Sequence, residues 1–297
     1  MKKFIATFYK FISVTNIKIF SENINKFYGN NDIKGSIIIA LEGINGSIYG
    51  LEDDVKSFVK KIKKIKELSD IKVRFSETEV IPYKNFKFKI KKEIVTIGDK
   101  EIQPSQKVGK YIDPDQWDEF ISQKDVVVID TRNKYEVKIG TFKNSINPKI
   151  NNFREFPIWW NENKDSFHGK KIAMFCTGGI RCEKSTSLVI NNGFEEVYHL
   201  KGGIIDYLKL PQKSISEWEG ECFVFDQRVS ITNFEEKGNY KLCFGCRRPI
   251  SFEDTKHFHY EEGVSCNECF YEHSFKRKEG FRERQRQKVL EEKNIKK

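Results

Sequence analysis

The chain has 297 residues, a net charge of +10, 38% hydrophobic residues and 13% aromatic residues. This length predicts two or three domains, and the aromatic content excludes a disordered chain. No segment approaches the roughly 18 uncharged apolar residues that a membrane span needs. The chain starts with MKKFIATFYKF, in which Lys10 interrupts the apolar run after the basic lead, and no small-residue cleavage site follows. We therefore interpret this segment as a first strand and not as a signal peptide, and we expect a cytoplasmic protein.

The positive charge is concentrated in the first third of the chain. Residues 1–100 carry 20 Lys and Arg against 12 Asp and Glu, whereas residues 101–220 carry 17 of each kind. A basic domain beside a neutral one favours a polyanionic partner. A general bias towards Lys explains the same numbers equally well.

The first third alternates between strand-like and helical segments. Strand-like runs occupy residues 4–12, 36–50 and 71–77, and apolar residues recur at helical spacing over 17–27 and 51–68. The second run counts as two strands because Asn45 and Gly46 form a turn within it. Gly29 and Asn30 are expected to end the first helix. The order β-α-β-β-α-β predicts a ferredoxin-like α+β domain over residues 1–98.

Residues 106–218 form a second predicted unit of a different class. A buried strand is expected at 126–129, and the stretches 170–194 and 196–208 each have the pattern of a strand, a Gly-rich loop and a helix. Asp113 is expected to cap a helix that has Pro114 at its first position. This alternation predicts a doubly wound α/β domain, in which functional loops lie at the carboxyl ends of the strands.

The loop CTGGIR, residues 176–181, joins one of these strands to a helix. Successive N–H groups of Gly178, Gly179 and Ile180 can form an anion-binding nest, and the helix dipole and Arg181 add positive potential. Together they lower the pKa of the Cys176 thiol, and the thiolate is the nucleophilic form. The alternative is a buried, inert Cys followed by an ordinary Gly turn.

Several motifs together resemble a rhodanese domain. They are Asp130-Thr131-Arg132, Gly140, Asn147-Pro148, the loop 176–181 and Lys201-Gly202-Gly203. The resemblance implies that Cys176 is the active cysteine and that Thr177, Gly178, Gly179, Ile180 and Arg181 form the loop around it. Rhodaneses use this six-residue loop for sulfur, and the related phosphatases have one residue more, so the loop favours a persulfide over a phosphoenzyme.

The longer strings CTGGIRCEKS and INPKINNFREFP, with the ferredoxin-like front and the four-Cys tail, resemble the rhodanese-containing tRNA uridine hydroxylases. This match covers nearly the whole chain. It implies oxygen-dependent formation of 5-hydroxyuridine at wobble position 34 of tRNA, with Cys176 as the essential thiol and molecular oxygen as co-substrate. The sequence contains no flavin, haem or nucleotide-binding motif.

Two other functions are compatible with the sequence. One is a sulfurtransferase that forms a Cys176 persulfide and passes its sulfur to tRNA or another acceptor. The other is an RNA- or protein-binding module with a vestigial loop, which the intact Cys, Gly pair and Arg disfavour.

Two residues near the loop each have two interpretations. Arg132 follows a strand end, where it either contacts the substrate and supports the loop or forms a salt bridge with Asp130 or Glu136. Cys182 either packs in the helix after the loop or resolves a sulfur adduct on Cys176. We expect the structural role for both residues.

The segment 219–274 contains two CxxC pairs with the spacing of a four-thiolate zinc ribbon. The four residues are Cys243, Cys246, Cys266 and Cys269. The prediction is a structural zinc; metal-free reduced pairs and an iron–sulfur cluster are the alternatives. His257, His259 and His273 either replace a Cys ligand or are merely exposed, and Cys222 is expected in a core.

Lysine clusters in the front domain suggest tRNA as the partner. The extended segment from Phe86 to Ile97 has Lys87, Lys89 and Lys91 at alternate positions, on one strand face, with Phe86 and Phe88 opposite them. Six further Lys lie on the helical segment 51–68, where they form either a phosphate-binding surface or only its solvated face: Lys56, Lys60, Lys61, Lys63, Lys64 and Lys66. The basic tail 275–297 is expected to be a solvated helix or disordered.

Overall fold

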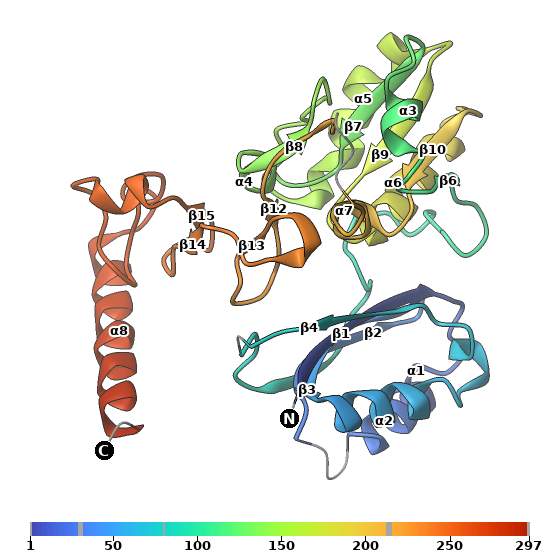
Figure 1. Ribbon diagram of the computed structural model, residues 1–297. Helices are drawn as coiled ribbons and strands as arrows, with labels where there is room; N and C mark the ends of the chain where they lie inside the picture. The colour runs from blue at the N-terminus through green and yellow to red at the C-terminus, as the bar shows by residue number, and fades with distance from the viewer. Residues whose placement is uncertain (1, 29–31, 80, 212–215, 296–297) are drawn as a thin grey trace.

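A computed structural model describes residues 2–28, 32–79, 81–211 and 216–295 of the chain (Figure 1). Two domains lie one above the other, and a smaller Cys-rich unit with a long helix extends to one side. Gly29 and Asn30, which were expected to end the first helix, lie outside the described residues. Within these ranges no helix is both long enough and apolar enough to cross a bilayer.

The front domain is a five-stranded sheet with helices on one face. Its elements are β1 (Lys3–Phe11), α1 (Ile17–Lys26), β2 (Lys34–Ala40), β3 (Gly43–Leu51), α2 (Glu52–Ile62), the 3-10 turn η1 (Lys66–Leu68), β4 (Val73–Glu77) and β5 (Phe86–Ile90). The strand order β4-β1-β3-β2-β5 confirms the ferredoxin-like fold, with β5 added parallel to β2 at the edge. The second helix is shorter than the predicted 51–68. It spans Glu52–Ile62, and Lys66–Leu68 form the separate 3-10 turn η1.

Alternation along the strands decides which face of this sheet is buried. The side that packs on α1 and α2 carries Ala6, Phe8, Ile37, Ile39, Ile44 and Ile48, together with Phe20, Ile24, Val55 and Phe58 from the helices. Phe86 and Phe88 pack against the same core, which confirms that they lie opposite the Lys residues of β5. Because side chains alternate along a strand, Tyr9 and Arg74 lie on the other face, where they contact the second domain.

The second domain confirms the predicted doubly wound α/β class. Its elements are β6 (Lys110–Ile112), α3 (Trp117–Ile121), β7 (Val126–Asp130), α4 (Lys134–Val137), β8 (Gly140–Phe142), η2 (Phe153–Glu155), α5 (Phe156–Asn163), η3 (Lys164–Phe167), β9 (Lys171–Phe175), α6 (Ile180–Asn191), β10 (Val197–Leu200), α7 (Gly203–Leu208) and β11 (Trp218–Gly220). Its parallel sheet has the order β6-β10-β9-β7. One core contains residues of α5 and α6, and another contains residues of α3 and α7.

The start of α3 differs from the prediction. Asp113 does not cap it, because residues 113–116 form a turn and the helix begins at Trp117 with Gln116 as its N-cap. The Asp113 carboxylate instead accepts a hydrogen bond from Lys201 at 2.5 Å. The sequence pattern Asp-Pro therefore marks the turn and not the helix.

The Cys-rich unit follows the second domain and shares part of its packing. Its elements are β12 (Cys222–Phe223), β13 (Ser230–Ile231), η4 (Asn233–Glu235), β14 (Lys241–Leu242), β15 (Pro249–Ile250), η5 (Glu253–Lys256) and α8 (Phe275–Ile295). Cys222 is fully buried, as expected, and packs with Ile231 in the core of the second domain. That core thus continues beyond residue 218, the predicted end of the domain.

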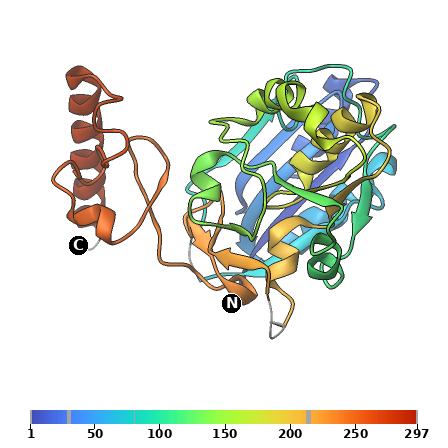
Figure 2. The same ribbon diagram turned by 90° about the horizontal axis from the view of Figure 1, so that it is seen from above.

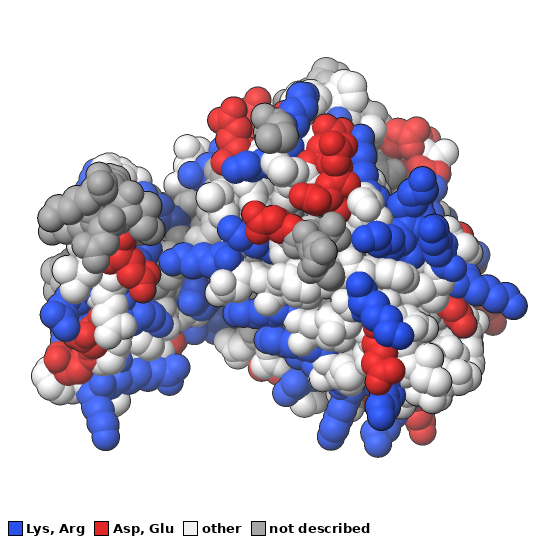
Figure 3. Space-filling view, turned by 90° about the horizontal axis from the view of Figure 1, so that it is seen from below, with Lys and Arg blue, Asp and Glu red and all other residues white. Residues whose placement is uncertain are grey.

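The basic tail is helical within the described residues and forms α8. The helix stands apart from the two domains in both views of the ribbon (Figures 1 and 2). Lys and Arg side chains are spread over the surface of the front domain that carries α1 and α2, and along α8 (Figure 3). Acidic side chains are fewer on this view. The two most basic parts of the chain are therefore open to solvent.

Candidate active site and metal centre

Cys176 lies where the sheet of the second domain ends. It follows β9 directly, and α6 begins at Ile180 with Gly179 as its N-cap. Gly179 has a φ of 96°, and a Cβ there would lie 2.8 Å from the Tyr9 hydroxyl, so glycine is required both by conformation and by space. This backbone geometry directs the Gly179 N–H towards the Cys176 Sγ, which accepts the hydrogen bond at 3.1 Å.

The loop converts a buried thiol into a thiolate. Burial alone raises the pKa of Cys176, but a hydrogen bond from the Cys182 thiol, the charge of Arg181 and the amides of Cys182 and Gly179 together lower that pKa to about 5. Cys176 is only 1% exposed. At neutral pH the site therefore presents a sulfur anion that the protein itself stabilises, which is the nucleophilic form predicted from the loop sequence.

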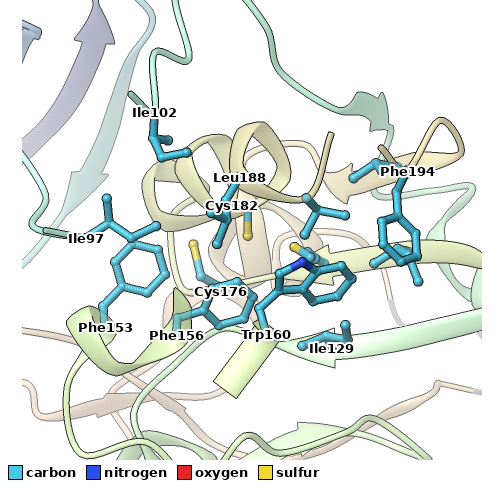
Figure 4. Packing of buried hydrophobic residues seen from close by; sticks show 14 of the residues in the cluster. Ile97, Ile102, Ile129, Phe153, Phe156, Trp160, Cys176, Cys182, Leu188 and Phe194 are labelled. Atoms are coloured by element: carbon cyan, nitrogen blue, oxygen red, sulfur yellow. The ribbon is translucent and has the colours of Figure 1, made fainter. Parts of the chain in front are cut away.

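Cys182 takes a role that neither sequence interpretation included. Its side chain is fully buried in the core cluster that also contains Cys176, Phe153 and Phe156 (Figure 4). Burial and the neighbouring Cys176 sulfur raise the pKa of Cys182 well above its usual range. It therefore stays a neutral thiol, which lies 3.7 Å from the Thr131 hydroxyl and helps to lower the pKa of Cys176. The packing role is present, and this effect on the Cys176 pKa adds to it.

Arg181 does not point freely into the loop. Its two terminal nitrogens donate to the two carboxylate oxygens of Glu136, each at 2.7 Å, and Nη2 lies 3.3 Å from the Thr177 hydroxyl. Glu136 is completely buried. Burial opposes its ionisation, but the charge and hydrogen bonds of Arg181 hold the pKa of Glu136 below its usual range. This bidentate pair fixes the guanidinium beside Cys176, where its charge stabilises the thiolate.

Of the two roles predicted for Arg132, the structure shows the salt bridge. Its side chain has no exposed surface, and it pairs with Asp130 through Nε at 2.9 Å and Nη2 at 2.6 Å. The same Nη2 donates to the Gly140 carbonyl at 2.6 Å. Arg132 thus ties the end of β7 to β8. The other predicted partner, Glu136, binds Arg181 instead.

The front domain reaches directly into the thiol loop. The Tyr9 hydroxyl of β1 donates to the Glu183 carboxylate at 2.8 Å. Arg74 of β4 donates to the Gly202 carbonyl at 2.8 Å and binds the Asp206 carboxylate through Nε at 2.6 Å. Ile180 packs on a small cluster formed by Phe11, Ala40 and Ile94 with Tyr9 and Val95. The loop therefore lies at the contact between the two domains.

Lys184 forms a buried link across this contact. Its ammonium group has no exposed surface and lies 2.8 Å from Glu42 and 2.5 Å from Glu93. Both carboxylates belong to the front domain or to the segment that follows it, and Lys184 belongs to α6. The string CTGGIRCEKS therefore combines two functions: residues 176–182 form the thiol site, and Glu183 and Lys184 hold the front domain against it.

Sequence reasoning missed these interdomain partners. Tyr9, Arg74 and Glu183 are separated along the chain by up to 174 residues, and no local pattern connects them. The one available signal was the pair of ionisable residues Glu183 and Lys184 directly after the loop. Charged residues are rarely buried unless they are paired, so charged residues at the start of a buried helix indicate partners from another element.

The four predicted metal ligands meet in one cluster. The sulfurs of Cys243, Cys246, Cys266 and Cys269 all lie within 4.8 Å of one another. The pairs Cys243–Cys269 and Cys246–Cys266 are both 3.8 Å apart, and Cys266–Cys269 is 3.7 Å. A tetrahedron with zinc–sulfur bonds of about 2.3 Å has sulfur–sulfur edges of about 3.8 Å. The geometry therefore fits a metal such as zinc held by four thiolates.

The surrounding chain supports a closed site. The Cys266 N–H donates to the Cys269 Sγ at 3.3 Å, and Cys243 exchanges backbone hydrogen bonds with Arg247 and Arg248. Three of the four cysteines are buried. His259 donates to or accepts from Asn267 and Tyr271, so it has partners of its own. The cluster of sulfurs that the structure describes is complete without a histidine.

Comparison with known protein families agrees with the domain structure. Residues 4–94 match the UPF0176 acylphosphatase-like domain, and residues 113–210 match the rhodanese-like domain. The ferredoxin-type front and the Cys176 loop thus fall in two separate family matches. The rhodanese match supports sulfurtransferase-like or other cysteine-based chemistry.

Solved structures resemble each domain separately. A rhodanese-related protein from Thermoplasma volcanium is 25% identical, with a TM-score of 0.28, over 33% of this chain and 90% of that one. A rhodanese-like domain protein from Staphylococcus aureus is 21% identical, with a TM-score of 0.28, over 36% and 96%. An acylphosphatase from Coxiella burnetii is 14% identical, with a TM-score of 0.22, over 29% and 92%.

The TM-scores are too low to support any argument about function. The folds of the two domains are identified by their strand orders and by the two family matches. The chain joins a UPF0176 acylphosphatase-like domain to a rhodanese-like domain, which is the architecture of UPF0176 proteins.

Proposed function

We propose that this protein is a tRNA-modifying enzyme that hydroxylates uridine 34 at C5 in an oxygen-dependent reaction, with Cys176 as the essential thiol. The observation that carries the proposal is a thiolate, with a pKa of about 5, placed where a basic domain meets the rhodanese-like domain. The strings CTGGIRCEKS and FREFP, which resemble the tRNA hydroxylases, lie together here, because Phe153 and Phe156 pack in the same cluster as Cys176.

The arrangement of the front sheet supports a nucleic-acid partner. In the strand register Tyr9 is opposite Asn45, Asn45 is opposite Ile38, and Ile38 is opposite Lys89. Opposite residues share a face of a sheet, so Lys89 and Tyr9 lie in one row, about 14 Å apart at roughly 4.8 Å per strand. A strand of RNA whose phosphates contact Lys89 therefore has a short path to the thiol loop that Tyr9 contacts.

The lysine surface has its own test. Lys87, Lys89 and Lys91 are exposed on β5 and the residue after it. Changing all three to Glu should weaken binding to every tRNA about equally, since phosphate contacts carry no sequence information. It should also lower the dependence of affinity on salt, by roughly one unit of log slope per lost contact. Unchanged affinity and slope would place the tRNA surface elsewhere, with α8 as the next candidate.

A sulfurtransferase is the second candidate, and the rhodanese-type loop is the observation that favours it. In that reaction the Cys176 thiolate attacks the outer sulfur of thiosulfate, the sulfur–sulfur bond breaks, and sulfite leaves with its electron pair. The product is a Cys176 persulfide anion, which the Gly179 N–H and Arg181 are positioned to stabilise. The persulfide then passes its outer sulfur to tRNA or another acceptor.

Mass spectrometry of tRNA nucleosides separates the candidates. A strain that lacks this gene is compared with one that carries it, and each is grown with and without oxygen. Loss of 5-hydroxyuridine in the deletion strain and in the oxygen-free culture supports the hydroxylase. Loss of a thiolated nucleoside supports the sulfurtransferase, and an unchanged nucleoside profile contradicts both the hydroxylase and a sulfurtransferase that acts on tRNA.

A further inference from the structure

Phe225 is an exposed aromatic residue at the edge of the thiol site. It lies in the turn between β12 and β13, and its ring centre is 5.9 Å from the guanidinium carbon of Arg181. The side chain is 64% exposed. Arg181 lies beside Cys176 and is held by Glu136, so the Phe225 ring lies next to a residue that stabilises the thiolate.

The turn that carries Phe225 is held in one conformation by its neighbours. The Asp226 carboxylate accepts hydrogen bonds from the Arg228 backbone N–H at 2.9 Å and from its guanidinium Nε at 3.0 Å and Nη2 at 2.8 Å. The Val224 N–H donates to the Val229 carbonyl at 2.9 Å. Both charged side chains are largely buried. The exposed ring therefore projects from a fixed support.

The ring has a packed edge and an open surface. The buried Phe223 ring lies 5.1 Å away, nearly perpendicular to the Phe225 ring, and fixes its orientation. Most of the Phe225 side chain remains in water, so its exposed apolar surface contributes no hydrophobic free energy to folding. An aromatic ring fixed beside a reactive group, with a free face, offers a stacking surface for a flat ligand.

We propose that Phe225 stacks on the unpaired pyrimidine base that is presented to Cys176. The proposal rests on the proposed function for the identity of the base. A nucleobase is favoured over an aromatic peptide side chain because a polynucleotide carries a negative charge on every phosphate, which is complementary to the exposed Lys87 and Lys89 of the front sheet. Bases in single-stranded loops can be splayed out and stacked on aromatic residues in this way.

The test compares two labelled single-stranded RNAs of anticodon-loop sequence, one with uridine at position 34 and one with an abasic site there. Their affinities are measured by fluorescence anisotropy for the wild-type protein, Phe225→Ala and Phe225→Trp. Phe252→Ala is the matched control, because Phe252 is 63% exposed and follows β15, in the part of the chain that carries the four clustered cysteines. The alkylation rate of Cys176 is recorded for each protein to show that the thiol loop is intact.

The wild-type protein should bind the uridine RNA roughly tenfold more tightly than the abasic RNA, as expected for one stacked base. Phe225→Ala should lose this difference with unchanged alkylation, whereas Phe225→Trp and Phe252→Ala should retain it. The proposal is overturned if Phe225→Ala discriminates as the wild type does, if Phe252→Ala loses discrimination equally, or if the wild type does not discriminate. Because binding is the readout, stacking can hold even where nucleoside analysis rejects hydroxylation.

Discussion

The chain contains two groups of cysteines that differ in what surrounds their sulfurs. Around Cys176 the neighbours are one neutral thiol, backbone N–H groups and the cation Arg181. In the Cys-rich unit each sulfur has other cysteine sulfurs at 3.7 to 3.8 Å. Four thiolates that close together require a cation, whereas a single thiolate can be stabilised by the protein alone. The surroundings of the first group thus suit a reactive thiolate, and those of the second suit a bound metal.

The largest expected effect is the loss of the reactive sulfur itself. Cys176→Ser should abolish the modification of tRNA while the fold and the tRNA affinity stay intact, since serine is nearly isosteric with cysteine. Nucleoside mass spectrometry measures the modification, circular dichroism the fold and fluorescence anisotropy the tRNA affinity. Full activity in Cys176→Ser would remove the thiol from the mechanism and, with it, the contrast between the two groups.

Removing the metal should affect only the second group. Structural zinc contributes about 10–16 kcal/mol in small zinc domains, so Cys266→Ser should lose the metal and leave the Cys-rich unit open to proteolysis. Elemental analysis should give one zinc per chain for the wild type and for Cys176→Ser. A purified wild-type protein with no metal and all seven thiols free to react with a thiol reagent would contradict this assignment.

The contact between the domains should depend on one buried ammonium group. Lys184→Met leaves the carboxylates of Glu42 and Glu93 without their cationic partner, which should cost about 3 kcal/mol of unfolding free energy. Lys56→Met is the control: its exposed pair with Glu52 contributes less than about 0.5 kcal/mol. Denaturant unfolding measures both, and equal small losses would show that Lys184 does not hold the domains together.

The hydrogen bond from Cys182 should have the smallest effect. Cys182→Ala removes the donor and should raise the pKa of Cys176 by roughly one to two units, as expected for a hydrogen bond to a charged group. Cys182→Ser keeps a donor and should leave the pKa close to that of the wild type. If the alanine and serine variants titrate alike, Cys182 only packs.

Local patterns in the sequence predicted most of the fold. Period-two and helical spacing located the strands and helices of the ferredoxin-like domain and β7, β9, α6, β10 and α7 of the second domain, but not β6, α4, β8 or α5. The spacing of Cys243, Cys246, Cys266 and Cys269 located the metal cluster. Cys176 and its loop were also predicted, because a strand end, a Gly pair and an Arg coincide there. Each of these signals lies within a few residues of the chain.

The missed features depend on contacts between distant residues. Glu136 pairs with Arg181 across 45 positions, and Lys184 meets Glu93 across 91. A charged residue in a sequence does not indicate which opposite charge it will meet after folding. The donor role of Cys182 was missed for a related reason: it depends on how tightly the first turn of α6 packs against the loop.

The pH dependence of Cys176 alkylation tests the central claim most directly. The metal-loaded protein is treated with iodoacetamide over pH 4 to 9, and labelling of the peptide that contains Cys176 is followed by mass spectrometry. Since only the thiolate reacts, the rate should rise through a midpoint near pH 5 and stay level above it. A rate that is low at pH 6 and still rising at pH 8 to 9, as for an ordinary thiol, would contradict the account.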